Sequence, residues 1–481
     1  MKTSTITLWS CCALLLTTVL NSCKKEIQQP KENSEIITIS YPEPYELANI
    51  ILALTDYGKS DRWEVQKDFE YYREVLDYFT PVQNHPLLDS VNYSRAKWKE
   101  LLSFRTDAYA FAFNNQNQLY RTTDFYANKG VQPFDDHLTL VNDFVEKSNF
   151  RDFFKKHLPY YEKIKKRYAQ TQYLNEMRSF LKAEFGDQFS QDQKYEVVVS
   201  PFVGRMNCHR TIDSITTADF ITLPKYVITD SIQIQPKNIA TSVHNLFTEM
   251  DHGYVNPTTE HYRELVLENF DAALWDHKSG YNENSEFGVF NEYMTWAVYD
   301  IFLTKHFPEY AREVGLYWSY QNDSRGFKYA QAFSQQLLKC YTERKEGQTL
   351  KDLYPQLLNW TAEFQKKATK PTVVSPKDSL AAAFSASTKI PLTFSEPMHA
   401  SDTLSVFVLD GKNFKKIHRL TKAKNQISWN ATKTELVLSI DLPNDRPAYY
   451  IQFNWWGAPY PLQSDKGVLI ASGRYFKVQK K

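Results

Sequence analysis

The stretch that decides the fold of the first domain covers residues 241–257 and reads TSVHNLFTEMDHGYVNP. Apolar residues recur in and just before it at helical spacing, which predicts an amphipathic helix: Ile239, Val243, Leu246, Phe247 and Met250. Gly253 and the Asn256-Pro257 pair predict where that helix ends. Residues three and four positions apart share a helix face, so the polar side chains between these apolar positions are expected to form one stripe.

The polar stripe differs by one residue from the zinc-binding motif HExxH. Positions 248–252 read Thr-Glu-Met-Asp-His, so Thr248 stands where the motif has its first histidine. Glu249 then takes the place of the general base and His252 that of the second imidazole. A zinc hydrolase needs three protein ligands and a carboxylate near its water molecule. Glu292, on an apolar helical segment further along the chain, is the candidate for the later ligand of a glutamate-type zincin.

Zinc binding is doubtful on these residues alone. Threonine is a poor zinc ligand because its neutral hydroxyl does not replace an imidazole, and His252 with Glu292 would hold zinc weakly. His244 lies about 12 Å from His252 along a helix axis, too far to share one tetrahedral metal. TExxH on an amphipathic helix, taken by itself, is usually a solvated polar face.

The rest of residues 36–366 predicts an α+β domain. A β-branched run at residues 195–200 and strand-like pieces within 219–229 precede the motif helix. Helical periodicity dominates elsewhere, at residues 45–54, 63–79, 94–105, 144–157, 160–185, 260–275, 288–307, 311–318, 327–342 and 350–366. This arrangement favours a mostly helical, zincin-like domain with a small sheet. In that fold an edge strand lines the cleft and can receive an extended peptide by strand addition.

The sequence pattern changes from helical to strand-like after a Pro- and Lys-rich linker at residues 367–379. Residues 380–481 contain short alternating strands, and Asp410-Gly411 is a strong hairpin signal. Strands at this spacing predict a β-sandwich. The segment 392–398, LTFSEPM, resembles the opening strand of bacterial Ig-like domains, which are spacer or adhesion modules.

The first 35 residues predict an anchor. Met1-Lys2 and the apolar run 8–20 have the form of a signal peptide, here residues 1–22, and the following Cys23 resembles a bacterial lipoprotein processing site. We therefore expect lipidation of Cys23, a polar tether over residues 23–35, and a membrane-anchored protein of the bacterial cell envelope, at the outer membrane. Cys208 and Cys340 remain in the mature chain and either pair or stay as buried thiols.

Composition excludes several other classes. The net charge is +1 with acidic and basic residues interspersed, which argues against nucleic acid as a partner. The chain has no GxSxG, no Gly-rich phosphate loop and no CxxC. No pair of carboxylates is marked out for glycoside hydrolysis.

Residues 249–257 resemble the motif region of the lipoproteins grouped as domain of unknown function 4932. There HExxH is followed by a hydrophobic step and Asn-Pro, and then by a glutamate on a downstream helix. Residues 79–86 and 200–202 resemble the upstream segments of that family. The resemblance covers residues 36–366 and implies a metallopeptidase fold. The chain departs from the pattern at Thr248 and at Trp296, where the resemblance implies an arginine.

Two functional expectations follow. The first is an envelope lipoprotein whose zinc-peptidase-like domain is degenerate, and which binds a peptide, protein or glycan or is structural. The alternative is an active zinc peptidase with Glu249 as general base, His252 and Glu292 as metal ligands and one further, unidentified ligand.

Overall fold

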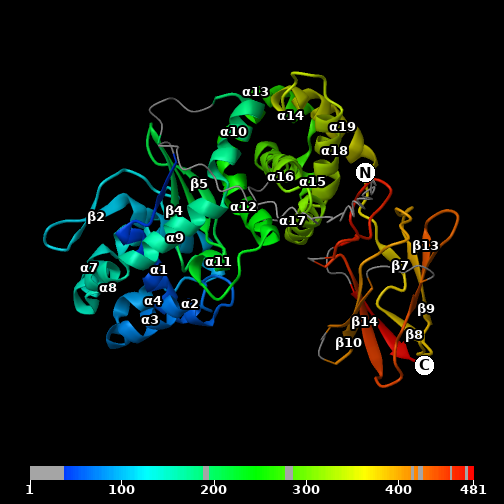
Figure 1. Ribbon diagram of the computed structural model, residues 1–481, viewed down its shortest axis with the longest axis horizontal. Coiled ribbons are helices and arrows are strands. Elements are labelled where there is room, and N and C mark those ends of the chain that lie inside the picture. Colours follow the sequence, from blue (N-terminus) through cyan, green and yellow to red (C-terminus); the bar gives the residue numbers. More distant parts are fainter. Residues whose placement is uncertain are drawn as a thin grey trace, which may run out of the picture.

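The computed structural model describes residues 37–187, 194–276, 285–412, 416–420, 426–455, 458–471 and 475–481. The predicted signal peptide, Cys23 and the tether lie outside the described residues. Helices and several small sheets share the chain, which confirms the α+β class (Figure 1). No helix among the described residues is both long and apolar enough to cross a membrane.

The N-terminal part is organised around a four-stranded sheet of order β1-β4-β6-β5. Its strands are β1 (Ile37–Ser40), β4 (Lys194–Ser200), β5 (Cys208–Thr211) and β6 (Thr216–Thr222). β1, β4 and β6 run parallel, whereas β5 runs antiparallel to β6 at the edge of the sheet. Central parallel strands are covered on both faces, which explains the nearly continuous apolar run in β4.

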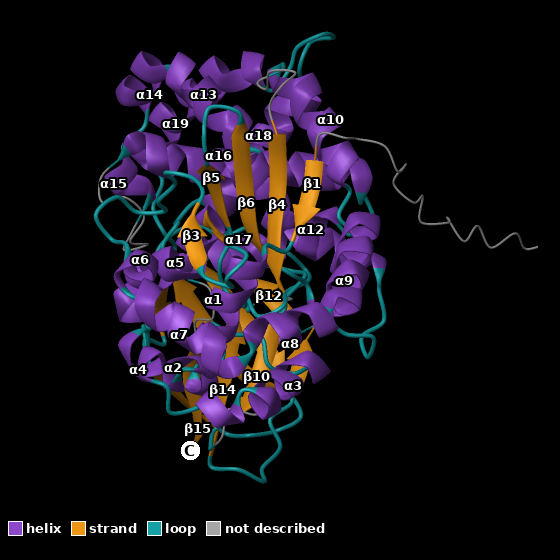
Figure 2. Ribbon diagram, turned by 90° about the vertical axis from the view of Figure 1, so that its left-hand side faces the viewer, coloured by secondary structure: helices purple, strands orange, loops and turns teal. Residues whose placement is uncertain are grey.

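Helices cover both faces of this sheet (Figures 1 and 2). On one face Phe220 of β6 packs against Tyr45 of α1, with ring centroids 5.3 Å apart. The motif helix α12 (Pro236–Met250) runs along the other side and contacts β6 and β5. The helices before the motif are α1 (Glu43–Leu54), α2 (Asp56–Ser60), α3 (Glu70–Tyr78), α4 (Pro86–Ser90), α5 (Trp98–Asp107), α6 (Pro133–Asp136), α7 (Leu138–Ser148), α8 (Phe150–Lys156), α9 (Leu158–Thr171), α10 (Leu174–Phe185) and α11 (Lys225–Ile228). A small hairpin pairs β2 (Phe111–Phe113) with β3 (Leu119–Arg121).

The motif helices and those after them form a second helical group. They are α12 (Pro236–Met250), α13 (His252–His261), α14 (Arg263–Asn269), α15 (Ala272–Trp275), α16 (Glu286–His306), α17 (Ala311–Arg325), α18 (Ala330–Thr342) and α19 (Tyr354–Lys367). α16 is buried on most sides and packs against α12, α13, α17 and α18. Its central position brings Glu292 close to the motif.

Two local predictions are wrong. The helix predicted over residues 63–79 begins only at Glu70, because Val65 pairs with Val203 in a β-bridge and holds the preceding residues extended. The second strand-like piece within 219–229 is the helix α11, which follows Pro224 and buries Tyr226, Val227 and Ile228. In both places tertiary packing overrides the local pattern.

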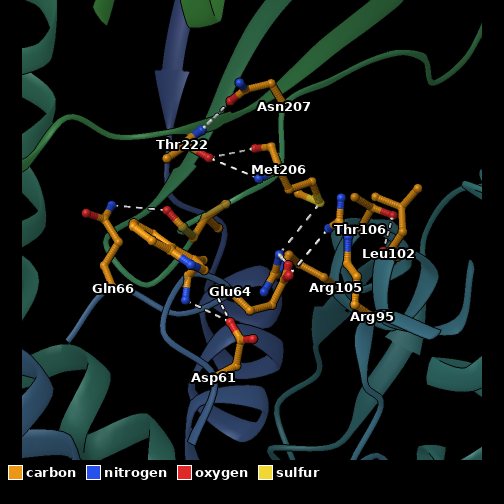
Figure 3. Close-up of polar contacts among 12 residues, drawn as sticks. Asp61, Glu64, Gln66, Arg95, Leu102, Arg105, Thr106, Met206, Asn207 and Thr222 are labelled. Atoms are coloured by element: carbon orange, nitrogen blue, oxygen red, sulfur yellow. Dashed lines mark hydrogen bonds and ion pairs between the residues drawn. The ribbon is translucent and has the colours of Figure 1, made fainter. Parts of the chain in front are cut away.

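The extended residues before α3 fix the segment that leads from β4 to β5 (Figure 3). Gln66 Nε2 donates to the carbonyls of Val203 and Leu223 at 3.0 and 2.9 Å. Glu64, 1% exposed, lies 3.7 Å from the guanidinium of the equally buried Arg105. Arg105 also approaches the Met206 sulfur at 3.9 Å. These contacts position the start of β5, the strand that reaches the motif helix.

The C-terminal part consists of two sheets that share one apolar core. The five-stranded sheet has the order β11-β10-β14-β15-β8 and the four-stranded sheet the order β12-β13-β9-β7. The strands are β7 (Val373–Ser375), β8 (Ser379–Ala382), β9 (Thr388–Phe394), β10 (Val406–Asp410), β11 (Lys416–Leu420), β12 (Ile427–Trp429), β13 (Glu435–Ile440), β14 (Ala448–Phe453) and β15 (Tyr475–Lys480). β10 and β11 form the antiparallel pair expected on either side of Asp410-Gly411.

The N-terminal and C-terminal parts also contact each other through side chains. Leu316 and Tyr320 of α17 form a small apolar cluster with Phe407, Leu409, Ala458 and Leu469. The buried Tyr320 hydroxyl donates to the carbonyl of Ala458 at 2.9 Å, and Gln331 of α18 donates to Gln463 at 2.5 Å. The C-terminal sheets are therefore packed against the second helical group.

We expect Tyr320→Phe to lower the free energy of unfolding by about 1 kcal/mol, since it leaves a buried carbonyl without its donor. Urea denaturation followed by circular dichroism measures this. Tyr120→Phe is the matched control, because Tyr120 is 49% exposed on β3 and its hydroxyl loss should be close to neutral. Equal effects of the two substitutions would contradict the prediction.

Candidate functional site

α12 and α13 together carry the motif. α12 begins with Pro236 and buries Val243, Leu246, Phe247 and Met250, as the apolar spacing predicts. It ends at Met250, and α13 begins at His252, so the predicted end at Asn256-Pro257 is wrong. Pro257 lies inside α13, where it removes one backbone hydrogen bond without ending the helix. The next turn is held by buried Thr258 and Thr259, which keeps the segment helical.

His252 and Glu292 lie next to each other, although they come from different helices. The His252 Nε2 atom is 3.6 Å from Glu292 Oε1, and their side chains are 17% and 13% exposed. The other imidazole nitrogen, Nδ1, is 3.1 Å from Asn256 Oδ1. A hydrogen-bond partner on Nδ1 is typical of a histidine whose other ring nitrogen, Nε2, is a metal ligand. The two predicted ligands therefore converge.

Glu249 completes the predicted group. Its Oε2 accepts a hydrogen bond of 3.0 Å from the backbone N–H of His209 in β5. Burial raises the pKa of Glu249 to about 7, and the nearby His252 opposes that rise. The negative charge of Glu292 lies within electrostatic range and raises the pKa of Glu249 further. Glu249 thus lies within electrostatic range of His252 and Glu292, the two residues that the structure places next to each other.

Thr248 is directed away from a ligand role. It is 6% exposed, and its hydroxyl donates to the carbonyl of His244 one turn earlier at 2.9 Å. This back-bonding is common for threonine inside a helix. His244 itself is buried, stacks on Trp318 with ring centroids 3.6 Å apart, and has a pKa well below its ordinary value because of burial. It belongs to the core.

Trp296, the second departure from the resembling family, lies one turn beyond Glu292 on α16. Its ring packs edge-on against Phe327, with centroids 4.6 Å apart. The guanidinium of Arg325, from the end of α17, lies 5.5 Å from the Trp296 ring centroid. A cation is thus present near this position, but it comes from another helix.

A His-Asp-Tyr chain lies beside the motif, and the sequence did not reveal it. His209 Nδ1 is 2.7 Å from Asp219 Oδ1, and the Tyr195 hydroxyl donates to the other oxygen of Asp219. Asp219 is completely buried in β6. Burial alone would lower the pKa of His209, but Asp219 and Glu249 raise it above its ordinary value. The available signal was Asp219 as the lone charged residue of β6, which reads TTADFIT.

The donor set does not match a catalytic zinc centre with three protein ligands. His252 and Glu292 fit by type and proximity, whereas the Thr248 hydroxyl is engaged by its own helix. Within the described ranges, no group of three or more His, Cys, Asp or Glu side chains is arranged to hold a metal ion. Zinc binding stays a prediction. Cys208 and Cys340 are both free and buried, so neither forms the bridge left open by the sequence.

Comparisons with known proteins add little. No protein-family profile and no curated protein match the chain. Among solved structures, the surface layer protein SbsC, domains 1-6, is similar with a TM-score of 0.18 and 12% sequence identity. That similarity covers 50% of this chain and 33% of the SbsC chain, and the TM-score is too low to support a shared fold. The resemblance to the family of domain of unknown function 4932 therefore rests on the motif residues.

Proposed function

We propose that this protein is a lipid-anchored envelope protein whose zincin-like domain binds an extended peptide without hydrolysing it. The observation that carries the proposal is the state of Thr248, which occupies the first ligand position while its hydroxyl bonds to the His244 carbonyl. The anchor would be Cys23, as the lipoprotein-type N-terminus predicts, and the C-terminal sheets would be an Ig-like spacer.

Loss of hydrolysis is supported by two features of the site. His252 and Glu292 offer one nitrogen and one carboxylate, one ligand fewer than a catalytic zinc centre uses. The carboxylate of Glu249 is already bound to the backbone of β5, whereas a general base must reach the proton of an attacking water. Neither feature favours turnover.

Peptide binding is supported by the position of β5. This strand is at the edge of the sheet, antiparallel to β6 and next to the motif helix. A sheet edge beside a cleft can take up an extended peptide through main-chain hydrogen bonds. An extended segment of a protein would bind in the same way, so the class of ligand is an unfolded or loop peptide.

Equilibrium dialysis with zinc tests the loss of the metal centre. We expect the full chain to lose zinc to a weak chelator, because two protein ligands hold it poorly. Stoichiometric zinc that survives this dialysis would overturn the degenerate site. Binding of blocked peptides, measured by fluorescence polarisation, tests the other half of the proposal, and no binding to any peptide of a broad panel would overturn it.

An active zinc peptidase remains the second candidate, because His252 and Glu292 converge and Glu249 is within electrostatic range of both. It predicts proteolysis that a chelator stops and that Glu249→Gln abolishes. The substitution keeps the shape and the acceptor oxygen but removes the base. Equal proteolysis by wild type and variant would exclude this candidate.

A further inference from the structure

The free edge of β5 is defined by its register with β6. Ile212 donates to the Thr216 carbonyl at 2.9 Å, which makes them a hydrogen-bonded pair. Such pairs alternate along an antiparallel ladder, and His209 faces Asp219 three residues further on. The N–H and C=O of His209 therefore point away from β6, toward the open edge.

Both of these edge groups are already occupied by side chains of the same protein. The N–H of His209 donates to Glu249 Oε2 at 3.0 Å. Its C=O accepts a hydrogen bond of 2.7 Å from Arg210 Nη1. A carboxylate acceptor and a guanidinium donor thus take the two places that the backbone of an added strand would need.

The position of His209 is itself fixed. Its imidazole bonds to Asp219, which is fully buried and also accepts from Tyr195 of β4. The strand is thereby tied to β6 through a side-chain hydrogen bond as well as through its ladder, and Asp219 of β6 is held in turn by Tyr195 of β4. The edge groups of His209 are therefore occupied by the side chains of Glu249 and Arg210 alone among the contacts given above.

We propose that Glu249 and Arg210 form a latch that closes the β5 edge, and that an extended peptide binds by displacing it. This inference rests on the proposed function and adds its regulation. The peptide carbonyl replaces the Glu249 carboxylate on the His209 N–H, and the peptide N–H replaces the Arg210 guanidinium on the His209 carbonyl. The released carboxylate stays within electrostatic range of His252, which offsets part of the loss.

The latch predicts different exchange rates of the His209 amide for two substitutions of Glu249. Glu249→Ala removes the acceptor, so the His209 amide should exchange with solvent at least tenfold faster in the absence of peptide. Glu249→Gln keeps an acceptor oxygen and should exchange within about threefold of wild type. Amide hydrogen exchange read by NMR on the full chain gives both rates.

Peptide affinity is measured on the same proteins. The probe is a fluorescein-labelled hexapeptide of alternating Thr and Val with both termini blocked, so that no terminal charge competes with Glu249. We expect it to bind Glu249→Ala about tenfold more tightly than wild type, because one charge-assisted hydrogen bond no longer has to be displaced. Arg210→Ala should give a gain in the same direction, and it tests the latch even if Glu249→Ala does not fold.

The outcomes separate the latch from the proposed function. Unchanged His209 exchange in Glu249→Ala overturns the latch. Equal binding of the probe by wild type, Glu249→Ala and Arg210→Ala also overturns it, while peptide binding itself stands. If neither wild type nor either variant binds the probe, the latch fails, and the proposed function fails with it when no peptide of the broad panel binds either. Faster exchange together with tighter binding supports both.

Discussion

Thr248→His is expected to raise zinc affinity by at least about 100-fold, since changes in the outer shell of a metal site alone cost 10–100-fold. His252 and Glu292 already lie 3.6 Å apart, and the new imidazole would enter the first ligand position, four residues before His252. Two histidines four apart on one helix face hold zinc in the HExxH motif. Competition with a fluorescent chelator measures the gain.

Thr248→Val is the matched control for that experiment. It keeps a β-branched side chain in the buried position, removes the hydroxyl that bonds to the His244 carbonyl, and offers no ligand. We expect its zinc affinity to equal that of wild type. No gain from Thr248→His would show that the break between α12 and α13 turns His252 out of register with position 248.

The stability of the protein is expected to rise as the pH falls from 8 to 6. Burial raises the pKa values of Glu46, Asp107, Glu249 and Asp300 each to about 7. In the unfolded chain these groups titrate near 4, so between pH 8 and 6 only the folded state gains their protons. Each fully titrating group adds roughly 1 kcal/mol over that interval, so the four together add several kcal/mol to the free energy of unfolding.

The buried histidines also contribute to the pH dependence of stability, and they act in different pH ranges. The raised pKa of His209 acts in the same direction, since its stabilisation is lost as the pH rises through the folded value. Burial lowers the pKa values of His244 and His306, the latter to about 4, so both oppose folding only below about pH 6.5. The gain should therefore be steepest above pH 6.5.

Urea denaturation at pH 8, 7 and 6 measures the trend, and Glu46→Gln is its control. Glu46 is fully buried and accepts from the Tyr71 hydroxyl at 2.9 Å, a bond that the amide oxygen can keep. The variant should lose part of the pH dependence, while Asp107, Glu249, Asp251 and Asp300, whose pKa values burial also raises, keep the rest. A free energy of unfolding that is level or lower at pH 6 would contradict the raised pKa values.

The candidate site was largely predictable where it depends on helix periodicity. Glu249 and His252 share a motif, and Glu292 stands out as an acid on an apolar helix. Helix spacing reports on neighbours within one segment, whereas the contact between β5 and α12 depends on strand order in the sheet. His209 and Asp219 are ten residues apart on two strands whose register no local pattern reveals. The helical side of the site was therefore predictable from the sequence, whereas the strand side with His209 and Asp219 was not.

The failed local predictions have the same cause. Residues 63–69 contain aromatic spacing that fits a helix, but the pairing of Val65 with Val203 and the buried Glu64 keep them out of a helical conformation. Pro257 predicts a helix end, yet α13 continues because Thr259 packs beside Tyr354 of α19, with their hydroxyl oxygens 3.4 Å apart. Each error lies where a distant segment supplies the deciding contact.

The chain between the helical part and the C-terminal sheets is pinned along its length. Lys370 forms an ion pair with Asp323 of α17, Pro371 and Pro376 are buried, and Val373–Ser375 form β7. Packed elements transmit strain, so a pull on the C-terminal sheets would be borne by α17 and α18 and passed to α16, the helix that carries Glu292. A continuous set of packed helices thus connects the C-terminal sheets with the candidate site.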